Sequence, residues 1–185
     1  MKKIIVILGT PCSGKSTHAK LLSKKLNYKY FSSGEFILEE IKNETGFGLI
    51  AKKYFDMKVS IPDEYLIRAV KEQIINLKED GIIFNGYPKT LSQAKALDAF
   101  LFVRKTNEPI AIFLYAETIA TRNRISEKSN NVDDGNVFKA IMNNFELKTR
   151  SVVDYYINKH GFDTSINDIE KINEEILIKI QKNVN

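Results

Sequence analysis

Hydrophobic and polar residues follow two alternating patterns along the chain. Short apolar runs rich in β-branched residues, such as residues 3–8, are typical of buried parallel strands. Longer stretches with apolar residues every three or four positions are typical of helices. Strands are predicted at residues 3–8, 28–31, 81–84 and 110–114, with a weaker pattern at 162–165. Helices are predicted directly after residue 17 and at residues 34–42, 48–57, 62–77, 91–103, 117–124, 136–159 and 168–182.

Strands that alternate with helices predict an α/β fold in which helices cover both faces of a parallel sheet. Ligands of such sheets bind at the carboxyl ends of the strands. Here those ends come at Leu8, Phe31, Phe84 and Leu114, and polar residues or glycine follow each of them. The pattern therefore predicts one shared site at one edge of the sheet.

Composition and charge narrow the class of protein. With 185 residues, 43% of them hydrophobic, the chain can bury one full core, so a single domain over residues 1–185 is expected. No apolar run approaches the roughly 20 residues of a membrane span, and the N-terminus has no signal-peptide layout. A single cysteine fits a reducing compartment, so we expect a cytoplasmic protein. The net charge of +5 comes from scattered lysines, which favours a cleft for small anions over a nucleic-acid surface.

A phosphate-binding loop lies between the first strand and the first helix. Its sequence is Gly9-Thr10-Pro11-Cys12-Ser13-Gly14-Lys15-Ser16-Thr17. Backbone N–H groups of such a loop and the positive end of the helix dipole surround a phosphate chain. Lys15 is expected to reach the β- and γ-phosphates of ATP, and the Ser16 hydroxyl to ligate Mg²⁺. The alternative is a glycine-rich turn without a ligand, but such a turn needs neither Lys15 nor Ser16.

Several further motifs resemble those of the adenylate kinase family. The loop matches the family's pattern except that Cys12 replaces a glycine, and Ser33-Gly34-Glu35 is similar to its T-G-D segment. The most specific match to the family is Asn85-Gly86-Tyr87-Pro88-Lys89-Thr90-Leu91-Ser92-Gln93-Ala94. Weaker matches are Ile61-Pro62-Asp63-Glu64, Asn131-Val132-Asp133-Asp134-Gly135 and Asp154-Tyr155-Tyr156. In order and at family spacing, the matches cover roughly residues 3 to 165.

The resemblance implies a three-layer fold with a five-stranded parallel sheet and two small mobile insertions. One insertion, at about residues 33–61, would clamp the monophosphate, and a short lid at about 125–136 would cover ATP. The implied reaction is reversible γ-phosphoryl transfer from Mg·ATP to AMP, which gives two ADP. The implied protein is a monomer whose partners are these small nucleotides, with Mg²⁺ as cofactor.

The resemblance also assigns roles to individual residues. Lys15, Lys89 and Arg122 would be catalytic, and Arg122 would also lie over the ATP adenine. Gln93 would read the adenine edge of AMP with its amide, although alone it would pass for a solvated helix glutamine. The expected ATP contacts are Gly9, Pro11, Cys12, Ser13, Gly14, Lys15, Ser16, Thr17 and Arg122. The expected AMP contacts are Ser33, Gly34, Leu38, Ile61, Gly86, Lys89 and Gln93.

Departures from the family are concentrated at its arginines. The chain has only five arginines, and the positions where the family carries further ones hold Leu38, Lys89, Ser126, Asn130 or Asn131, and Ile141. Arg124 is a near-substitute, and Asn85 stands where the family has an aspartate. Forked guanidinium groups bind phosphoryl oxygens bidentately, and one such arginine contributes about 10³ to 10⁵ in rate in related systems. Lysines such as Lys52, Lys58, Lys128 or Lys139 are candidates to compensate.

Three functions are compatible with this pattern. The first is a working kinase for AMP, and the second is a catalytically weakened nucleotide binder with a regulatory or scaffold role. The third is a kinase for another small substrate, such as UMP or CMP. Gln93 with Ser33 favours the first, whereas Leu38 and Ile141 favour the second.

Other polar and aromatic residues have more ordinary interpretations. Cys12 is either a redox-sensitive thiol in the loop or simply a small residue tolerated there. His18 and His160 have no ligand partners at metal spacing, so both are expected to be solvated or packed. Asp133 and Asp134 either pair with lysines in the lid or cap the helix that begins near Asn136. Aromatic residues that could line the monophosphate pocket, but more often pack in a core, are Phe36, Tyr54, Phe55 and Tyr65.

Overall fold

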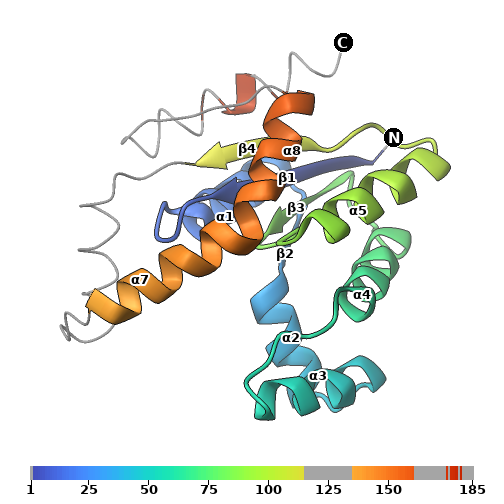
Figure 1. The fold of residues 1–185 in the computed structure, drawn as a ribbon. Helices are drawn as coiled ribbons and strands as arrows, with labels where there is room; N and C mark the ends of the chain where they lie inside the picture. Colours follow the sequence, from blue (N-terminus) through green and yellow to red (C-terminus); the bar gives the residue numbers. More distant parts are fainter. Residues whose placement is uncertain (1, 115–134, 161–173, 175, 179, 181–185) are drawn as a thin grey trace.

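Four parallel strands form the centre of the molecule (Figure 1). The computed structural model describes residues 2–114, 135–160, 174, 176–178 and 180. The strands are β1 (Lys3–Gly9), β2 (Lys29–Ser32), β3 (Gly81–Asn85) and β4 (Ile110–Leu114), in the order β2-β3-β1-β4. They confirm four predicted strands to within a residue or two. The fifth, at residues 162–165, lies outside the described residues.

Helices connect these strands where the hydrophobic periodicity predicts them. They are α1 (Lys15–Leu26), α2 (Ser33–Lys42), α3 (Gly46–Asp56), α4 (Asp63–Ile75), α5 (Leu91–Val103), α7 (Gly135–Asn144) and α8 (Arg150–His160). Side chains of Ser32, Thr45 and Thr90 cap α2, α3 and α5 by accepting a hydrogen bond from the backbone N–H three residues on. The predicted helix at 117–124 lies outside the described residues, and the few described positions of the one at 168–182 are helical.

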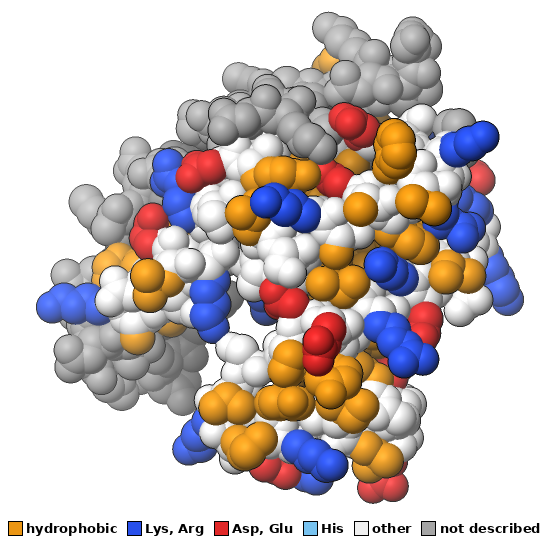
Figure 2. Space-filling model, turned by 45° about the vertical axis from the view of Figure 1, so that its right-hand side comes forward, with side chains coloured by type: hydrophobic (Ala, Val, Ile, Leu, Met, Phe, Trp, Pro, Cys, Tyr) orange, Lys and Arg blue, Asp and Glu red, His pale blue; other side chains and the backbone are white. Residues whose placement is uncertain are grey.

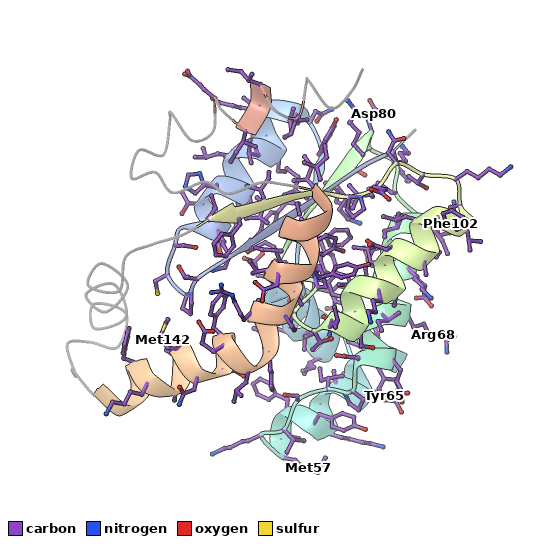
Figure 3. The ribbon with its side chains drawn as sticks, turned by 45° about the horizontal axis from the view of Figure 1, so that its top comes forward. Met57, Tyr65, Arg68, Asp80, Phe102 and Met142 are labelled. Atoms are coloured by element: carbon purple, nitrogen blue, oxygen red, sulfur yellow. The ribbon has the colours of Figure 1, made fainter. Side chains whose placement is uncertain are left out.

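The predicted helix at residues 136–159 is a single run interrupted by a π-helical turn. This turn, η1 (Phe145–Thr149), joins α7 to α8. Figure 3 shows α7 and α8 meeting at an angle there, as expected where a wider turn interrupts the α-helical hydrogen bonds. The sequence pattern predicted the helix but not this interruption.

Strand alternation divides the core into two layers, one on each face of the sheet. Ile4, Val6 and Leu8 of β1 point to the face that α4, α5 and α8 cover. Ile5 and Ile7 point to the other face, where they pack with α1 and with Ile176 and Ile180. The α/β architecture with helices on both faces is therefore confirmed for the described residues.

The pair α2 and α3 projects away from the sheet (Figure 1). Phe36 and Phe47 stack between the two helices, with ring centroids 5.5 Å apart. Gly48 allows this close packing, because a Cβ there would lie 1.9 Å from the carbonyl oxygen of Glu40. Figure 2 shows hydrophobic side chains gathered over this part of the surface, where the exposed ones include Leu38, Phe55 and Met57. Among the described residues, no helix is long and apolar enough to cross a membrane.

Candidate nucleotide-binding site

The carboxyl ends of the strands bring the predicted motifs to one edge of the sheet. Asn85, at the end of β3, is in register with Ile7 of β1 and Ser32 of β2, and Gly9 is in register with Leu114. The phosphate-binding loop therefore begins beside the segment that starts at Asn85. The structure confirms that these motifs share one edge of the sheet.

Two glycines give the loop its shape. Gly9 has φ 151°, and a Cβ there would lie 2.0 Å from the carbonyl oxygen of Leu114. Gly14 has φ 85° and occupies the N-cap of α1, so it leaves the first-turn N–H groups without a side-chain cap. Uncapped N–H groups at the positive end of a helix are suited to bind an anion.

Lys15 points back over the loop. Its Nζ donates to the carbonyl oxygen of Thr10 at 2.5 Å and to Ser13 Oγ at 3.4 Å. These two contacts hold the ammonium group against the loop. This arrangement provides a positive charge and backbone donors together, which suits a polyphosphate chain.

A chain of polar side chains joins the loop to the start of α2. Asn85 is buried, and its Nδ2 donates to Ser16 Oγ and to the Tyr30 hydroxyl, both at 3.0 Å. The Tyr30 hydroxyl lies 3.4 Å from Glu35 Oε1, and Glu35 also pairs with Lys20 at 3.2 Å. Sequence reasoning missed Tyr30, although its place in β2, three residues before the Ser33-Gly34-Glu35 segment, could have indicated it.

The donor atoms around Ser16 fit a magnesium ion that arrives with a nucleotide. Among the described residues, no cluster of three His, Cys, Asp or Glu side chains could hold a metal ion by itself. Mg²⁺ in nucleotide sites usually has few protein ligands and takes its other ligands from phosphates and water. The Ser16 hydroxyl matches that pattern, whereas the Asn85 amide presents its Nδ2–H donors to Ser16 and Tyr30 and so offers no ligand oxygen to that side.

The second half of the site is built around Gly86. Its φ is 74°, and its carbonyl oxygen accepts a hydrogen bond from Ser33 Oγ at 2.5 Å. This bond joins the end of β3 to the start of α2. A Cβ at Gly34 would meet open space, so a ligand can approach the backbone there.

Gln93 is held by two bonds to the protein. It is only 4% exposed, its Oε1 accepts from the Lys89 backbone N–H at 2.8 Å, and its Nε2 donates to Asp63 Oδ1 at 2.6 Å. The other Asp63 oxygen accepts from Thr90 Oγ1 at 2.5 Å. The interpretation of Gln93 as a solvated helix residue is therefore wrong. Asp63, which the sequence analysis named only as part of the Ile61–Glu64 match, fixes the orientation of the amide.

Comparison with known proteins identifies the family. The family model for adenylate kinase matches residues 7–161. An adenylate kinase of Flavobacterium psychrophilum is 34% identical over 177 residues, which is 92% of this chain and 92% of that protein. One of Parabacteroides distasonis is 32% identical over 98% of this chain and 97% of that protein. The chain belongs to the adenylate kinase family. The resemblance seen in the sequence is confirmed, and with it the class of enzyme, a nucleotide-binding nucleoside monophosphate kinase.

Cys12 departs from the adenylate kinase family pattern, and its backbone has a conformation typical of glycine. Cys12 has φ 56°, in the left-handed region that favours glycine, and glycine is the residue in the family pattern at this position. The side chain is half-buried. Glycine would adopt this backbone conformation with less strain than cysteine does.

Two further described departures, Leu38 and Lys89, lie on the monophosphate side. Leu38 is 55% exposed on α2, so it neither fills the core nor offers a charge. Lys89 keeps a charge, and its Cε would lie 3.5 Å from a Cβ at Gly86. Desolvation lowers the pKa of Lys89, and the positive charge of Lys148 lowers it further, although the side chain remains exposed. Ile61 and Ile141 are half-buried.

Several predicted residues fall where the structure gives no description. Arg122, Arg124, Ser126, Lys128, Asn130, Asn131, Asp133 and Asp134 all lie outside the described residues, as do residues 125–134 of the predicted lid. The side chain of His160 is likewise not described, whereas His18 is packed, with 2% of its surface exposed.

The aromatic residues near the second half of the site mostly pack against one another. Phe36 contacts the rings of Phe31 and Phe47. The rings of Tyr54 on α3 and Tyr65 on α4 lie 6.3 Å apart, and Figure 3 labels Tyr65 on α4. For Phe36, core packing is the correct interpretation. Phe55 differs, because it is 58% exposed.

Proposed function

We propose that the protein catalyses reversible transfer of the γ-phosphoryl group of Mg·ATP to AMP, giving two ADP. One observation carries this proposal. The phosphate loop follows β1 and the Gly86–Gln93 segment follows β3, and these two strands are neighbours in the sheet. A triphosphate on the loop and a monophosphate near Gly86 would therefore face each other across the same edge, as transfer between them requires.

The loop residues supply the donor half of the mechanism. Backbone N–H groups of the loop would hold the phosphates, and Lys15 would leave its Thr10 contact to neutralise the β- and γ-phosphates. The Ser16 hydroxyl is the group that would ligate Mg²⁺, and the Asn85 amide would position that hydroxyl. When bound, Mg²⁺ would supply positive charge that offsets the negative charge developing during transfer.

The acceptor half provides a reason to favour adenine. A glutamine amide carries two N–H donors on nitrogen and two lone pairs on oxygen. Asp63 and the Lys89 N–H each use one of these and hold the amide, which leaves one donor and one acceptor that a ligand could use. This pair is complementary to the adenine edge, with its amino donor and ring-nitrogen acceptor. Lys89, beside Gly86, would contact the monophosphate.

An assay against four acceptors tests this function. The protein is incubated with Mg·ATP and each of AMP, GMP, CMP and UMP, and ADP formation is counted, with Lys15→Ala as the inactive comparison. We expect turnover with AMP that is lost in Lys15→Ala and kept in Lys24→Ala, where the exposed lysine lies in the last turn of α1. ATP binding without transfer to any acceptor would instead support a weakened nucleotide binder. Activity confined to UMP or CMP would support a kinase of different specificity.

The remaining expectations belong to the same proposal. Residues 1–185 would form one domain with insertions at about 33–61 and 125–136, and Arg122 would contact the ATP adenine. The protein would act as a monomer in the cytoplasm. Light scattering with and without nucleotides measures the first part of that expectation, and a mass of one chain is the expected result.

A further inference from the structure

Lys148 comes from the π-helical turn and reaches toward the acceptor half of the site. The turn changes the direction in which side chains leave the helix between Phe145, which is buried, and the buried residues of α8. The Lys148 side chain is exposed, and its Nζ donates to Ser60 Oγ at 2.9 Å. Ser60 is 88 positions away in sequence, so this bond joins two distant parts of the chain. Short π-helical turns occur frequently at functional sites.

Ser60 is connected to Lys89 by a short series of contacts. It lies one residue before Ile61 and three before Asp63, whose carboxylate binds both Thr90 and Gln93. Gln93 in turn accepts a hydrogen bond from the Lys89 backbone. These bonds hold the Ser60–Asp63 segment against the Lys89–Gln93 segment. Lys148, through its bond to Ser60, and Lys89 therefore lie on segments that are joined to each other.

The charge interaction between the lysines supports this placement. Lys148 is close enough to lower the pKa of Lys89 by repulsion. Two ammonium groups without an anion between them repel each other, whereas a phosphate between them would be attracted by both. Leu38 provides no charge on the facing helix, so the phosphate of a monophosphate would depend on these lysines.

We propose that Lys148 is a second phosphate-binding ammonium group, which together with Lys89 holds the phosphate of the acceptor nucleotide. The role of Lys148 rests on the function proposed above. Ser60 would hold the ammonium group when the acceptor is absent and release it to the phosphate when the acceptor binds. Lys52 is less suited to this role, because it pairs with Asp56 on the same helix at 3.3 Å.

Affinities of Lys148→Met for AMP and for adenosine test this role. Adenosine presents the same base and ribose without the phosphate. We expect the dissociation constant for AMP to rise about tenfold in Lys148→Met, the effect of losing one charge-assisted hydrogen bond. The inhibition constant for adenosine and the KM for ATP should stay within twofold. Lys148→Arg should restore AMP binding, and Lys24→Met should behave as the unchanged protein does.

The variant Ser60→Ala distinguishes the effect of the Lys148 charge from the effect of the Lys148–Ser60 hydrogen bond. This variant keeps Lys148 and removes only the hydroxyl, so AMP should bind as well as before or better. If Ser60→Ala weakens AMP binding as much as Lys148→Met, the bond is a structural tether and the role of Lys148 is overturned. An equal loss of adenosine affinity in Lys148→Met, or no loss for AMP, would overturn it as well.

The two proposals fail in different ways. Unchanged AMP affinity in Lys148→Met, with AMP still phosphorylated by the unaltered protein, would contradict only the role of Lys148. Absence of both AMP binding and AMP phosphorylation in the unaltered protein would contradict the proposed function and this role together. Melting curves of each variant confirm that a changed affinity does not come from partial unfolding.

Discussion

The two halves of the site differ in what provides their chemistry. In the donor half, backbone N–H groups and the conformations of Gly9 and Gly14 form the cradle, with Lys15 and Ser16 added. In the proposed acceptor half, side chains would form the site, namely Ser33, Lys89, Gln93 and Asp63. The phosphate loop itself keeps the family pattern except at Cys12, whereas the guanidinium groups that the family places at the monophosphate are replaced by Leu38 and Lys89. Recognition by backbone groups restricts the sequence closely, whereas a charge can be supplied from another position.

The difference between Lys15 and Lys89 is expected to give the largest effect. Lys15→Ala should lower kcat/KM by about a thousandfold, because the Lys15 charge stabilises the phosphoryl group during its transfer. Lys89→Ala should lower it by only about ten- to a hundredfold, mainly through the KM for AMP, because Lys148 would still supply a positive charge. Steady-state kinetics with each nucleotide varied in turn measures both. Equal losses in the two variants would contradict the contrast between the halves.

Removal of the Asp63 carboxylate should affect only the acceptor half. Asp63→Ala frees the Gln93 amide and the Thr90 hydroxyl, so the KM for AMP should rise about tenfold or more while the KM for ATP stays unchanged. The free energy of unfolding should fall by about 1–3 kcal/mol, since buried polar groups lose a partner. Glu64→Ala, at the exposed neighbouring position, is the control and should change neither quantity. A matching rise in the KM for ATP would show that Asp63 supports both halves.

Restoring a guanidinium group should raise the affinity of the acceptor half for AMP. Leu38 is exposed, so Leu38→Arg costs little core packing and places a forked cation on α2. We expect AMP affinity to rise about tenfold, on the scale of one charge-assisted hydrogen bond. Calorimetric titration with AMP measures it, and Leu49→Arg, on the exposed surface of α3, provides the comparison. If both variants bind AMP equally well, general attraction by the added charge is sufficient.

The smallest expected effect concerns the backbone of the donor half. Cys12→Gly removes a side chain from a residue with φ 56°, so the free energy of unfolding should increase by about 0.5–1 kcal/mol. Chemical denaturation of the two proteins gives the difference. Alkylation of Cys12 with and without ATP serves as an independent measure of access to the loop. A lower stability of Cys12→Gly would mean that the thiol makes contacts which outweigh the backbone strain.

The sequence alone predicted the features of the fold and the site that depend on local patterns. The four described strands, the phosphate loop between β1 and α1, and the meeting of the motifs at one sheet edge were all predicted, because apolar periodicity and strand ends determine them. Helix bounds agreed to within a few residues, and α5 matched its prediction at both ends.

Contacts between distant segments could not be predicted in the same way. The burial of Gln93 depends on Asp63, which is 30 positions away, and the approach of Lys148 to Ser60 depends on a π-helical turn with no periodic signal of its own. The lysines proposed from sequence as substitutes for arginine did not include Lys148. Those lysines were chosen because they lie near the replaced arginines in sequence, whereas the fold brings Lys148 to Ser60 from 88 positions away.

The most direct measurement follows the phosphoryl group itself. The protein is mixed with ATP labelled in its γ-phosphate, unlabelled AMP and Mg²⁺, and the products are separated and counted. The account predicts that the label moves into ADP formed from AMP, with two ADP for each ATP consumed. Label that stays in ATP, or that is released as inorganic phosphate, would contradict it.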